Sequence, residues 1–210
     1  MRKTAKWLLM LSTFSRFFSK TKQASVCLIG EVNTGKSTLA NRISNDFTGS
    51  DMSAVSTIAH ETRDIVKLEH VNFNSEGKKL DLTLVDTPGI ATAIDYKEFV
   101  GQGIPEDQAM QRAKEATAGI IKAIKFLEEV DIAVVMMDAT KTPFDQVSLT
   151  LMGTLEMNKK KTIIVANKTD LPGAKPELIT STFPQHKVVP ISALNGEGMG
   201  NLYNTISEVA

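Results

Sequence analysis

Residues 25–37 read SVCLIGEVNTGKS, and this stretch decides the fold of the chain. An apolar run typical of a buried strand leads into the pattern GxxxxGK(S/T), and residues of helical period follow it. Glycines at both ends allow a tight loop whose amides point inward at phosphate oxygens, helped by the positive end of the following helix. The stretch therefore predicts a strand, a phosphate-binding loop and a helix in succession.

The residue types in this loop have separate expected roles. We expect Lys36 to lie against the β and γ phosphates of a nucleotide and Ser37 to offer its hydroxyl to Mg²⁺. The alternative is a glycine-bearing turn that holds a chance lysine, but the strand and helix on either side favour the phosphate loop. The predicted phosphate-binding residues are Asn33, Thr34, Gly35, Lys36, Ser37 and Thr38.

The rest of the chain alternates strand-like runs with segments of helical period, as expected of βαβ units and a parallel sheet. Predicted strands cover residues 26–30, 65–73, 80–86, 132–138, 162–167 and 187–190, and predicted helices cover 36–44, 106–129, 144–157, 176–182 and 199–209. The hairpin turn at residues 74–77 makes the second and third strands antiparallel. In the long helix, one face is expected to carry Met110, Ala113, Thr117, Ile120, Ile121, Ile124 and Leu127.

A second motif selects the base. Residues 167–170 read NKTD at the end of a predicted strand, where an α/β sheet places its ligand sites. The Asp170 carboxylate can accept the N1 and N2 protons of guanine, a donor pair that adenine lacks. Asn167 is expected to brace the loop and Lys168 to cover the ring. The SAL stretch Ser192, Ala193 and Leu194 follows the last strand, and the Ala193 amide is the expected donor to guanine O6.

A third motif concerns hydrolysis. Residues 86–89 read DTPG at the end of another predicted strand. A carboxylate at Asp86 can hold a water bound to Mg²⁺, and the Gly89 amide can meet the γ phosphate. A plain turn explains the tetrapeptide alone, but the order of all the motifs favours a nucleotide site.

With these motifs in order, the chain resembles the TRAFAC class of small GTPases, specifically the Era and TrmE group. The resemblance implies a three-layer P-loop GTPase domain with a six-stranded mixed, mostly parallel sheet, which binds GTP or GDP with Mg²⁺ and hydrolyses GTP. It also implies that Thr62 completes the Mg²⁺ ligands together with Ser37 and Asp86, with Thr57 as a local rival.

The resemblance bears on the mechanism as well. Ile90 stands where Ras-like proteins have a glutamine that orients the attacking water, and its side chain cannot hydrogen-bond to water. In this group, an asparagine at the place of Asn33 ligates K⁺, which supplies positive charge to the transition state. We expect slow hydrolysis that K⁺ accelerates; the alternatives are that Asn33 only tolerates the loop geometry, or that the chain binds GTP without turnover.

Two features depart from the group. Era proteins carry a C-terminal KH domain that binds RNA, but this sequence ends one helix beyond Leu194, so we expect that RNA role not to transfer. The segment from residue 90 to residue 130 is longer than usual. Because switch II responds to the γ phosphate, this segment is expected to bind an unknown protein effector as a lid. A passive surface loop is the alternative.

Net charge divides the 210 residues into two parts. Residues 1–22 carry six basic and no acidic side chains, whereas the rest carry 18 basic and 24 acidic ones. The single cysteine excludes an internal disulfide, and no apolar run is long enough to span a bilayer. The acidic body argues against non-specific nucleic-acid binding.

The basic end is expected to form an amphipathic helix over residues 1–24, ahead of a GTP-binding domain over residues 25–210. On a helix, its apolar stripe would hold Trp7, Met10, Leu11, Phe14, Phe17 and Phe18. This composition suits an interfacial helix on a membrane with anionic lipids. Packing on the domain, docking on a partner, a targeting peptide and RNA contact are the alternatives.

The sequence thus predicts a cytoplasmic molecular switch, peripheral on the cytoplasmic face of a membrane, that acts in membrane organisation, division or vesicle formation. The alternative function is that of an Era-like GTPase associated with ribosome assembly or RNA.

Overall fold

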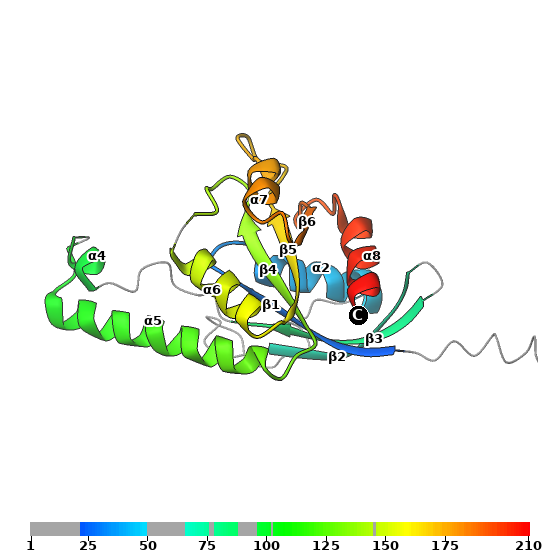
Figure 1. Ribbon diagram of the computed structural model, residues 1–210, viewed down its shortest axis with the longest axis horizontal. Helices are drawn as coiled ribbons and strands as arrows, with labels where there is room; N and C mark the ends of the chain where they lie inside the picture. The colour runs from blue at the N-terminus through cyan, green and yellow to red at the C-terminus, as the bar shows by residue number, and fades with distance from the viewer. Residues whose placement is uncertain (1–21, 50–65, 76–77, 88–95, 102, 145) are drawn as a thin grey trace, which may run out of the picture.

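The computed structural model describes residues 22–49, 66–75, 78–87, 96–101, 103–144 and 146–210. Its sheet has the strand order β2-β3-β1-β4-β5-β6 (Figure 1). The strands are β1 (Lys22–Gly30), β2 (Val66–Ser75), β3 (Lys78–Asp86), β4 (Ile132–Asp138), β5 (Lys161–Asn167) and β6 (Lys187–Pro190). The helices are α2 (Lys36–Thr48), α4 (Tyr96–Gly101), α5 (Glu106–Leu127), α6 (Gln146–Met157), α7 (Pro176–Thr182) and α8 (Met199–Val209).

The sheet is mixed, as predicted. β1 pairs in parallel with β3 and β4, and β5 pairs in parallel with β4 and β6. Only β2, at one edge, runs antiparallel, and its pairing with β3 extends to Ser75 and Lys78. A short hairpin returns the chain antiparallel, whereas each parallel pair needs a crossover, here mostly helical.

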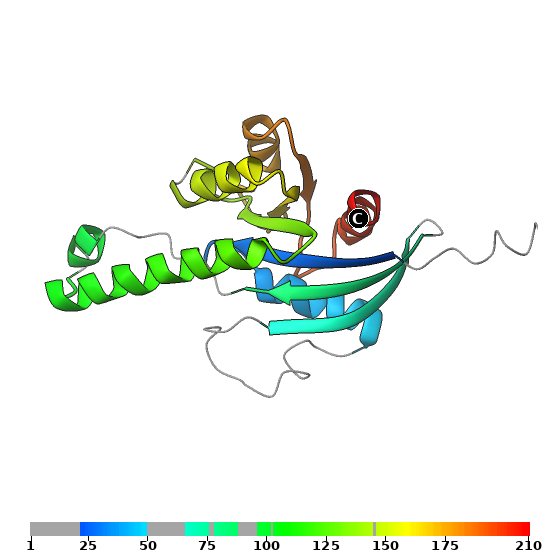
Figure 2. The same ribbon diagram turned by 60° about the horizontal axis from the view of Figure 1, so that its bottom comes forward.

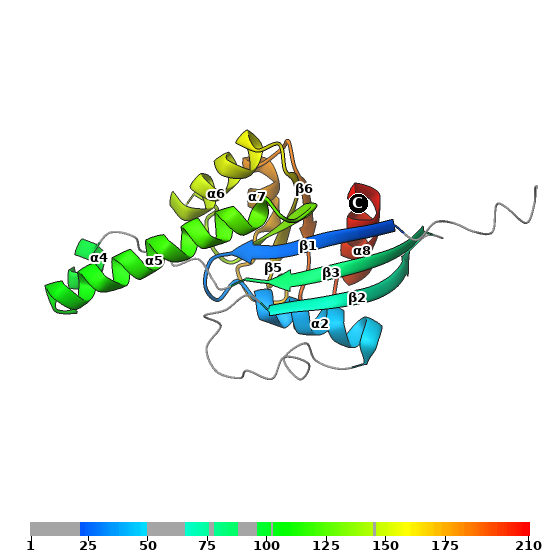
Figure 3. The same ribbon diagram turned by 90° about the horizontal axis from the view of Figure 1, so that it is seen from below.

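Helices cover both faces of the sheet, so the three-layer architecture is confirmed (Figures 2 and 3). One core joins the sheet to α2 and α8 through residues such as Leu39 and Leu202, both fully buried. The other core joins it to α6, α7 and the end of α5 through residues such as Leu155 and Ile179. All residues of β4 are buried, which explains why its sequence is a continuous apolar run.

The register of the parallel strands determines where the polar motifs meet. Leu28 of β1 is level with Asp86, and Gly30 is level with Met136. Asp138 is level with Asn167. Because these strands run in the same direction, the phosphate loop, Asp86 and Asn167 all lie at the carboxyl ends of the strands, where an α/β fold places its ligands.

Two element assignments need correction. Residues 22–24, which the sequence assigned to an N-terminal helix, belong to β1, where their register continues the pairing with β3. Helix α4 was not predicted, because its six residues are too few to show a helical period.

The apolar face predicted for α5 is buried only near the end of the helix. Met110 is 47% exposed and Ile121 is 51% exposed, whereas Phe126 and Leu127 near the last turn are buried. The helix extends beyond the sheet, and α4 lies beside its far end (Figures 1 and 3). Among the described residues, α5 joins the core against the sheet only at its end, although Ala109 near its start is buried as well.

In the parts of the chain that the structure describes, no helix combines the length and the hydropathy that a membrane span requires.

Candidate functional site

The phosphate loop lies between β1 and α2, and two positions in it require glycine. A Cβ on Gly30 would lie 2.3 Å from the carbonyl oxygen of Met136 on β4. Gly35 adopts φ 93°, and a Cβ there would lie 2.3 Å from Nδ2 of Asn167. The loop therefore packs directly on the neighbouring strands, which brings the start of α2 to the edge of the sheet.

Lys36 is buried and points back into the loop. Its Nζ donates to the carbonyl oxygens of Gly30 at 3.0 Å and Glu31 at 2.5 Å. Burial lowers the pKa of Lys36 to about 8, against the attraction of Asp86 and Glu31. Phosphate oxygens at this position would favour the charged ammonium, which is the chemistry predicted for this lysine.

Ser37 and Asp86 lie together at the mouth of the loop. The Ser37 hydroxyl donates to Oδ2 of Asp86 at 2.8 Å. The second oxygen, Oδ1, is buried and has no hydrogen-bond partner among the described residues. Burial raises the pKa of the Asp86 carboxyl, against the hydrogen bond from Ser37.

This pair fits the divalent cation that the fold implies. A hydroxyl beside a carboxylate with one unsatisfied oxygen is a hard oxygen donor set of the kind Mg²⁺ uses together with water and phosphate. Ser37 and Asp86 would hold the ion, which would supply positive charge to the phosphate groups when bound.

Asn167 joins the phosphate loop to the SAL stretch. Its Nδ2 donates to the carbonyl oxygen of Thr34 at 2.8 Å, and its Oδ1 accepts from the Ala193 amide at 2.9 Å. The bracing role predicted for Asn167 is therefore visible in its contacts. The Ala193 amide, predicted to donate to guanine O6, has a protein acceptor in this structure.

Lys168 forms a salt bridge with an acidic residue at the end of the neighbouring strand β4. Its Nζ donates to Oδ2 of Asp138 at 2.6 Å, and Lys168 itself adopts φ 68°. Burial opposes ionisation of Asp138, but hydrogen bonds from Lys168 and Thr140 outweigh it and lower the pKa of that carboxyl. Asp170 follows in the same loop and is partly exposed, so its carboxylate remains accessible to a ligand.

The structure also places three further predicted site residues, two of them exposed and one buried. Asn33 is exposed and adopts φ 65°, so it has the left-handed geometry that the sequence offered as one explanation for an asparagine here. Thr38 is exposed in the first turn of α2, where backbone amides lack partners within the helix. Ser192 is buried and accepts a hydrogen bond from the Asn195 amide at 3.1 Å. Thr57, Thr62, Gly89 and Ile90 lie outside the described residues.

Two residues of the site were missed by sequence reasoning. Asp138 could have been found from its place at the end of a buried strand, level with Asn167. Glu31 is buried at the second position of the phosphate loop, and its Oε2 lies 3.6 Å from Nζ of Lys141. No pattern in the sequence indicated this ion pair, because it depends on how the loop after β4 folds back.

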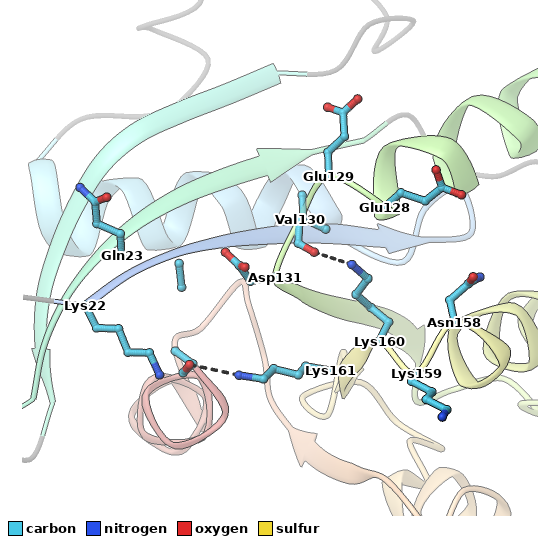
Figure 4. A pocket seen from close by; sticks show the side chains of 12 residues that line it. Lys22, Gln23, Glu128, Glu129, Val130, Asp131, Asn158, Lys159, Lys160 and Lys161 are labelled. Atoms are coloured by element: carbon cyan, nitrogen blue, oxygen red, sulfur yellow. Dashed lines mark hydrogen bonds between the residues drawn. The ribbon is translucent and has the colours of Figure 1, made fainter.

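Two cavities lie at opposite ends of the sheet. One of about 460 Å³ adjoins the phosphate loop and is lined by Glu31, Thr34, Asp138 and Lys141 among others. The other, of about 520 Å³, lies where β1, β4 and β5 begin, between Lys22, Glu128 and Lys160 (Figure 4). Lys160 there donates to the Val130 carbonyl oxygen at 2.6 Å. Since the motifs gather at the first end, the larger cavity is not the nucleotide site.

The comparison with known families agrees with this geometry. A family model described as "50S ribosome-binding GTPase" matches residues 25–168, which hold the phosphate loop, Asp86 and Asn167. The chain belongs to this family. This GTPase is 30% identical over 200 residues to the tRNA modification GTPase MnmE of Streptococcus thermophilus, a match that covers 95% of the chain and 36% of the relative. It is also 30% identical over 185 residues to MnmE of Acetivibrio thermocellus, covering 87% of the chain and 33% of the relative. The chain thus spans about a third of the length of these curated relatives.

Solved structures of Era proteins resemble the GTPase closely in fold. Aquifex aeolicus Era bound to GDP·AlF₄⁻ matches with a TM-score of 0.64 at 27% identity, covering 90% of this chain and 57% of that one. Era in complex with MgGDPNP and a stretch of 16S ribosomal RNA matches with a TM-score of 0.64 at 26% identity and the same coverage. The chain is accordingly a GTP-binding GTPase domain of the Era and MnmE type, as the sequence motifs predicted.

Proposed function

We propose that this GTPase is a molecular switch that binds GTP with Mg²⁺ at the carboxyl ends of the strands and acts on a ribosomal or RNA-containing partner. The observation that carries the nucleotide site is the side chain of Asn167, whose two hydrogen bonds join the phosphate loop to the SAL stretch. In this assignment Lys36, Ser37 and Asp86 serve the phosphates and the metal, and Asn167, Lys168 and Asp170 serve the base.

The comparisons support the RNA-associated alternative better than the membrane function. The family model is described by ribosome binding, the MnmE relatives are named for tRNA modification, and one Era structure contains ribosomal RNA. Membrane contact through residues 1–22 stays a prediction, because residues 1–21 lie outside the described part of the chain. Residues 23–210 carry 24 acidic against 18 basic side chains, which argues against non-specific RNA binding by this part of the chain.

Sedimentation separates these two functions. Full-length protein with a non-hydrolysable GTP analogue is expected to pellet with ribosomal particles more than protein with GDP, since a switch binds its partner in one nucleotide state. A version that begins at Lys22, where β1 starts, tests whether the basic end is needed. A full-length variant with glutamine in place of Arg2, Lys3, Lys6, Arg16 and Lys20 is the matched control for charge.

Liposomes with anionic lipids are run alongside. Co-sedimentation with liposomes that disappears in both altered versions, without ribosome pelleting, would reverse the proposal and restore the membrane function. Ribosome pelleting that is equal in GDP and in the GTP analogue would contradict the switch.

We also propose that Asn33 holds a monovalent cation during hydrolysis, because no glutamine follows the DTPG motif. In KCl, hydrolysis is expected to be about tenfold faster than in NaCl, the size of effect expected when one charge is added near the developing transition state. Asn33→Gly tests the role cleanly, since glycine tolerates φ 65° and removes only the side-chain amide. This variant is expected to hydrolyse GTP equally slowly in both salts. A preserved preference for KCl in Asn33→Gly would leave Asn33 with a geometric role only.

The segment from residue 90 to residue 130 is proposed to contact an effector protein. In its described part, α4 and most of α5 stand away from the sheet and expose Met110 and Ile121. Exposed apolar residues on a helix next to a switch are the usual material of a nucleotide-dependent interface.

A further inference from the structure

We propose that Arg42 of α2 is the positioning residue that holds the base loop in shape for guanine, and that it thereby sets how long a nucleotide stays bound. The base loop is residues 192–196, between β6 and α8. The inference rests on the proposed assignment of the guanine site.

Arg42 contacts the base loop through two adjacent carbonyl groups. Its Nε donates to the carbonyl oxygen of Ala193 at 3.2 Å, and its Nη2 donates to that of Leu194 at 2.5 Å. The guanidinium also lies against the loop backbone, since a Cβ on Gly196 would be 3.5 Å from Nη1. A planar guanidinium presents donors in a fixed fork, which suits two neighbouring carbonyls.

Ala193 is consequently held from two sides. Its amide donates to Oδ1 of Asn167, and its carbonyl oxygen accepts from Arg42. The described chain contains no cis peptide bond, and the C=O and N–H of a trans peptide point in opposite directions. Fixing the Ala193 carbonyl on Arg42 therefore also fixes the direction of the Leu194 amide, a second backbone donor available to the base.

The position of Arg42 on α2 links the base loop to the phosphates. The same helix begins with Lys36 and Ser37, about 9 Å away at the usual rise per residue. The base loop is thus attached to the phosphate side at two points: Asn167 reaches Thr34, and Arg42 reaches Ala193 and Leu194. Because Arg42 is half-buried, solvent screens these charge-assisted hydrogen bonds only in part. Opening the base loop to release guanine requires them to break.

The test is the dissociation rate of a fluorescent GDP chased with excess unlabelled GDP. Arg42→Ala is expected to release GDP about tenfold faster or more, since each lost charge-assisted hydrogen bond is worth about one power of ten. Arg42→Lys is expected to fall in between, because a single ammonium lacks the fork. A merely structural role would speed release equally in both variants, so an intermediate rate for Arg42→Lys is the readout that identifies a positioning role.

Tyr203→Phe is the matched control. The Tyr203 hydroxyl donates to Oδ2 of Asp46, another link between α2 and the C-terminal region, and the ring also packs edge-on against Phe47. Phenylalanine keeps the ring contact and removes the hydrogen bond to Asp46, while both hydrogen bonds of Arg42 to the base loop are retained, so GDP release is expected at the wild-type rate.

The outcomes separate the inference from the assignment beneath it. Wild-type release from both Arg42 variants, with GDP still bound, overturns the inference and leaves the guanine site in place. Release from Tyr203→Phe as fast as from Arg42→Ala also overturns it, because the effect would then be a general loosening of α2. A wild-type protein that binds no GDP overturns both the inference and the assignment.

Discussion

Lys36→Ala is expected to lower the affinity for GTP about 100-fold or more. The ammonium is the positively charged group of the phosphate loop, and the loss of its charge-assisted hydrogen bonds to two phosphates removes about 3 kcal/mol or more of binding free energy. Equilibrium binding of a fluorescent GTP analogue measures the loss, and GTP turnover at a substrate concentration near the wild-type KM is expected to fall with it.

The same substitution is not expected to destabilise the nucleotide-free protein. Burial lowers the pKa of Lys36 to about 8, so at pH 7 the folded protein holds an ammonium that its surroundings disfavour. Between pH 8 and the ordinary lysine pKa of 10.5, the unfolded chain binds more protons at this residue, so its contribution to stability rises with pH. Alanine removes the free-energy cost of burying this ammonium, and the Tm without nucleotide at pH 7 is expected to stay equal or rise.

The control for Lys36→Ala is Lys125→Ala, in the last turn of α5, which removes an exposed lysine far from the motifs. Its GTP affinity is expected to equal that of the wild type. Normal GTP affinity in Lys36→Ala would contradict the assignment of the phosphate loop, and a large fall in its Tm would mean that the lysine is structural.

Asp170→Asn is expected to exchange guanine for xanthine. The carboxylate accepts both the N1 and N2 protons of guanine, whereas an amide would place a donor opposite the N2 donor. Xanthine carries a carbonyl at that position and can accept from the amide. A site built to hydrogen-bond one partner rejects the mismatched one strongly, so GTP affinity is expected to fall about 100-fold or more.

Competition of GTP and XTP for a fluorescent guanine nucleotide on the wild type, and for a fluorescent xanthine nucleotide on the variant, measures this exchange. Asp107→Asn makes the same chemical change at an exposed position in the first turn of α5 and is expected to leave both affinities unaltered. Asp170 follows directly on a loop fixed by the Thr169 amide, which donates to the Ile191 carbonyl oxygen at 3.2 Å. The substitution is therefore not expected to change the structure of the loop, so a loss of GTP affinity reports on the base contact. Equal GTP affinity in Asp170→Asn and the wild type would place the base elsewhere.

Much of the fold could be predicted because its signals are local. β4, β6, α7 and α8 begin and end at the predicted residues, since apolar runs and turn residues mark both ends of each. The position of the motifs at the carboxyl ends of the strands was also predicted correctly, because their order along the chain and the parallel pairing are sufficient to place them together.

What could not be predicted depends on contacts between distant segments. The period of α5 indicates an amphipathic helix, but it cannot indicate that the sheet ends before the helix does and leaves Met110 exposed. Arg42 carries no signal in a sequence, because its partners are carbonyl oxygens 151 and 152 residues later. The salt bridge between Lys168 and Asp138 is of the same kind, since the lysine was assigned to the base and its acidic partner was not considered.

Because α5 extends beyond the sheet, a small rotation at its seated end would produce a large displacement at its other end. A helix of 22 residues is about 33 Å long. Its last turn is seated in the core through Phe126 and Leu127, close to the start of β4, while its first turns lie beside α4 at the far end. With the seated end as the pivot, a rotation of roughly 10° displaces the far end by roughly 6 Å. A small adjustment inside the domain would in this way become a displacement as large as a helical turn at the end of α5 that the proposed effector would contact.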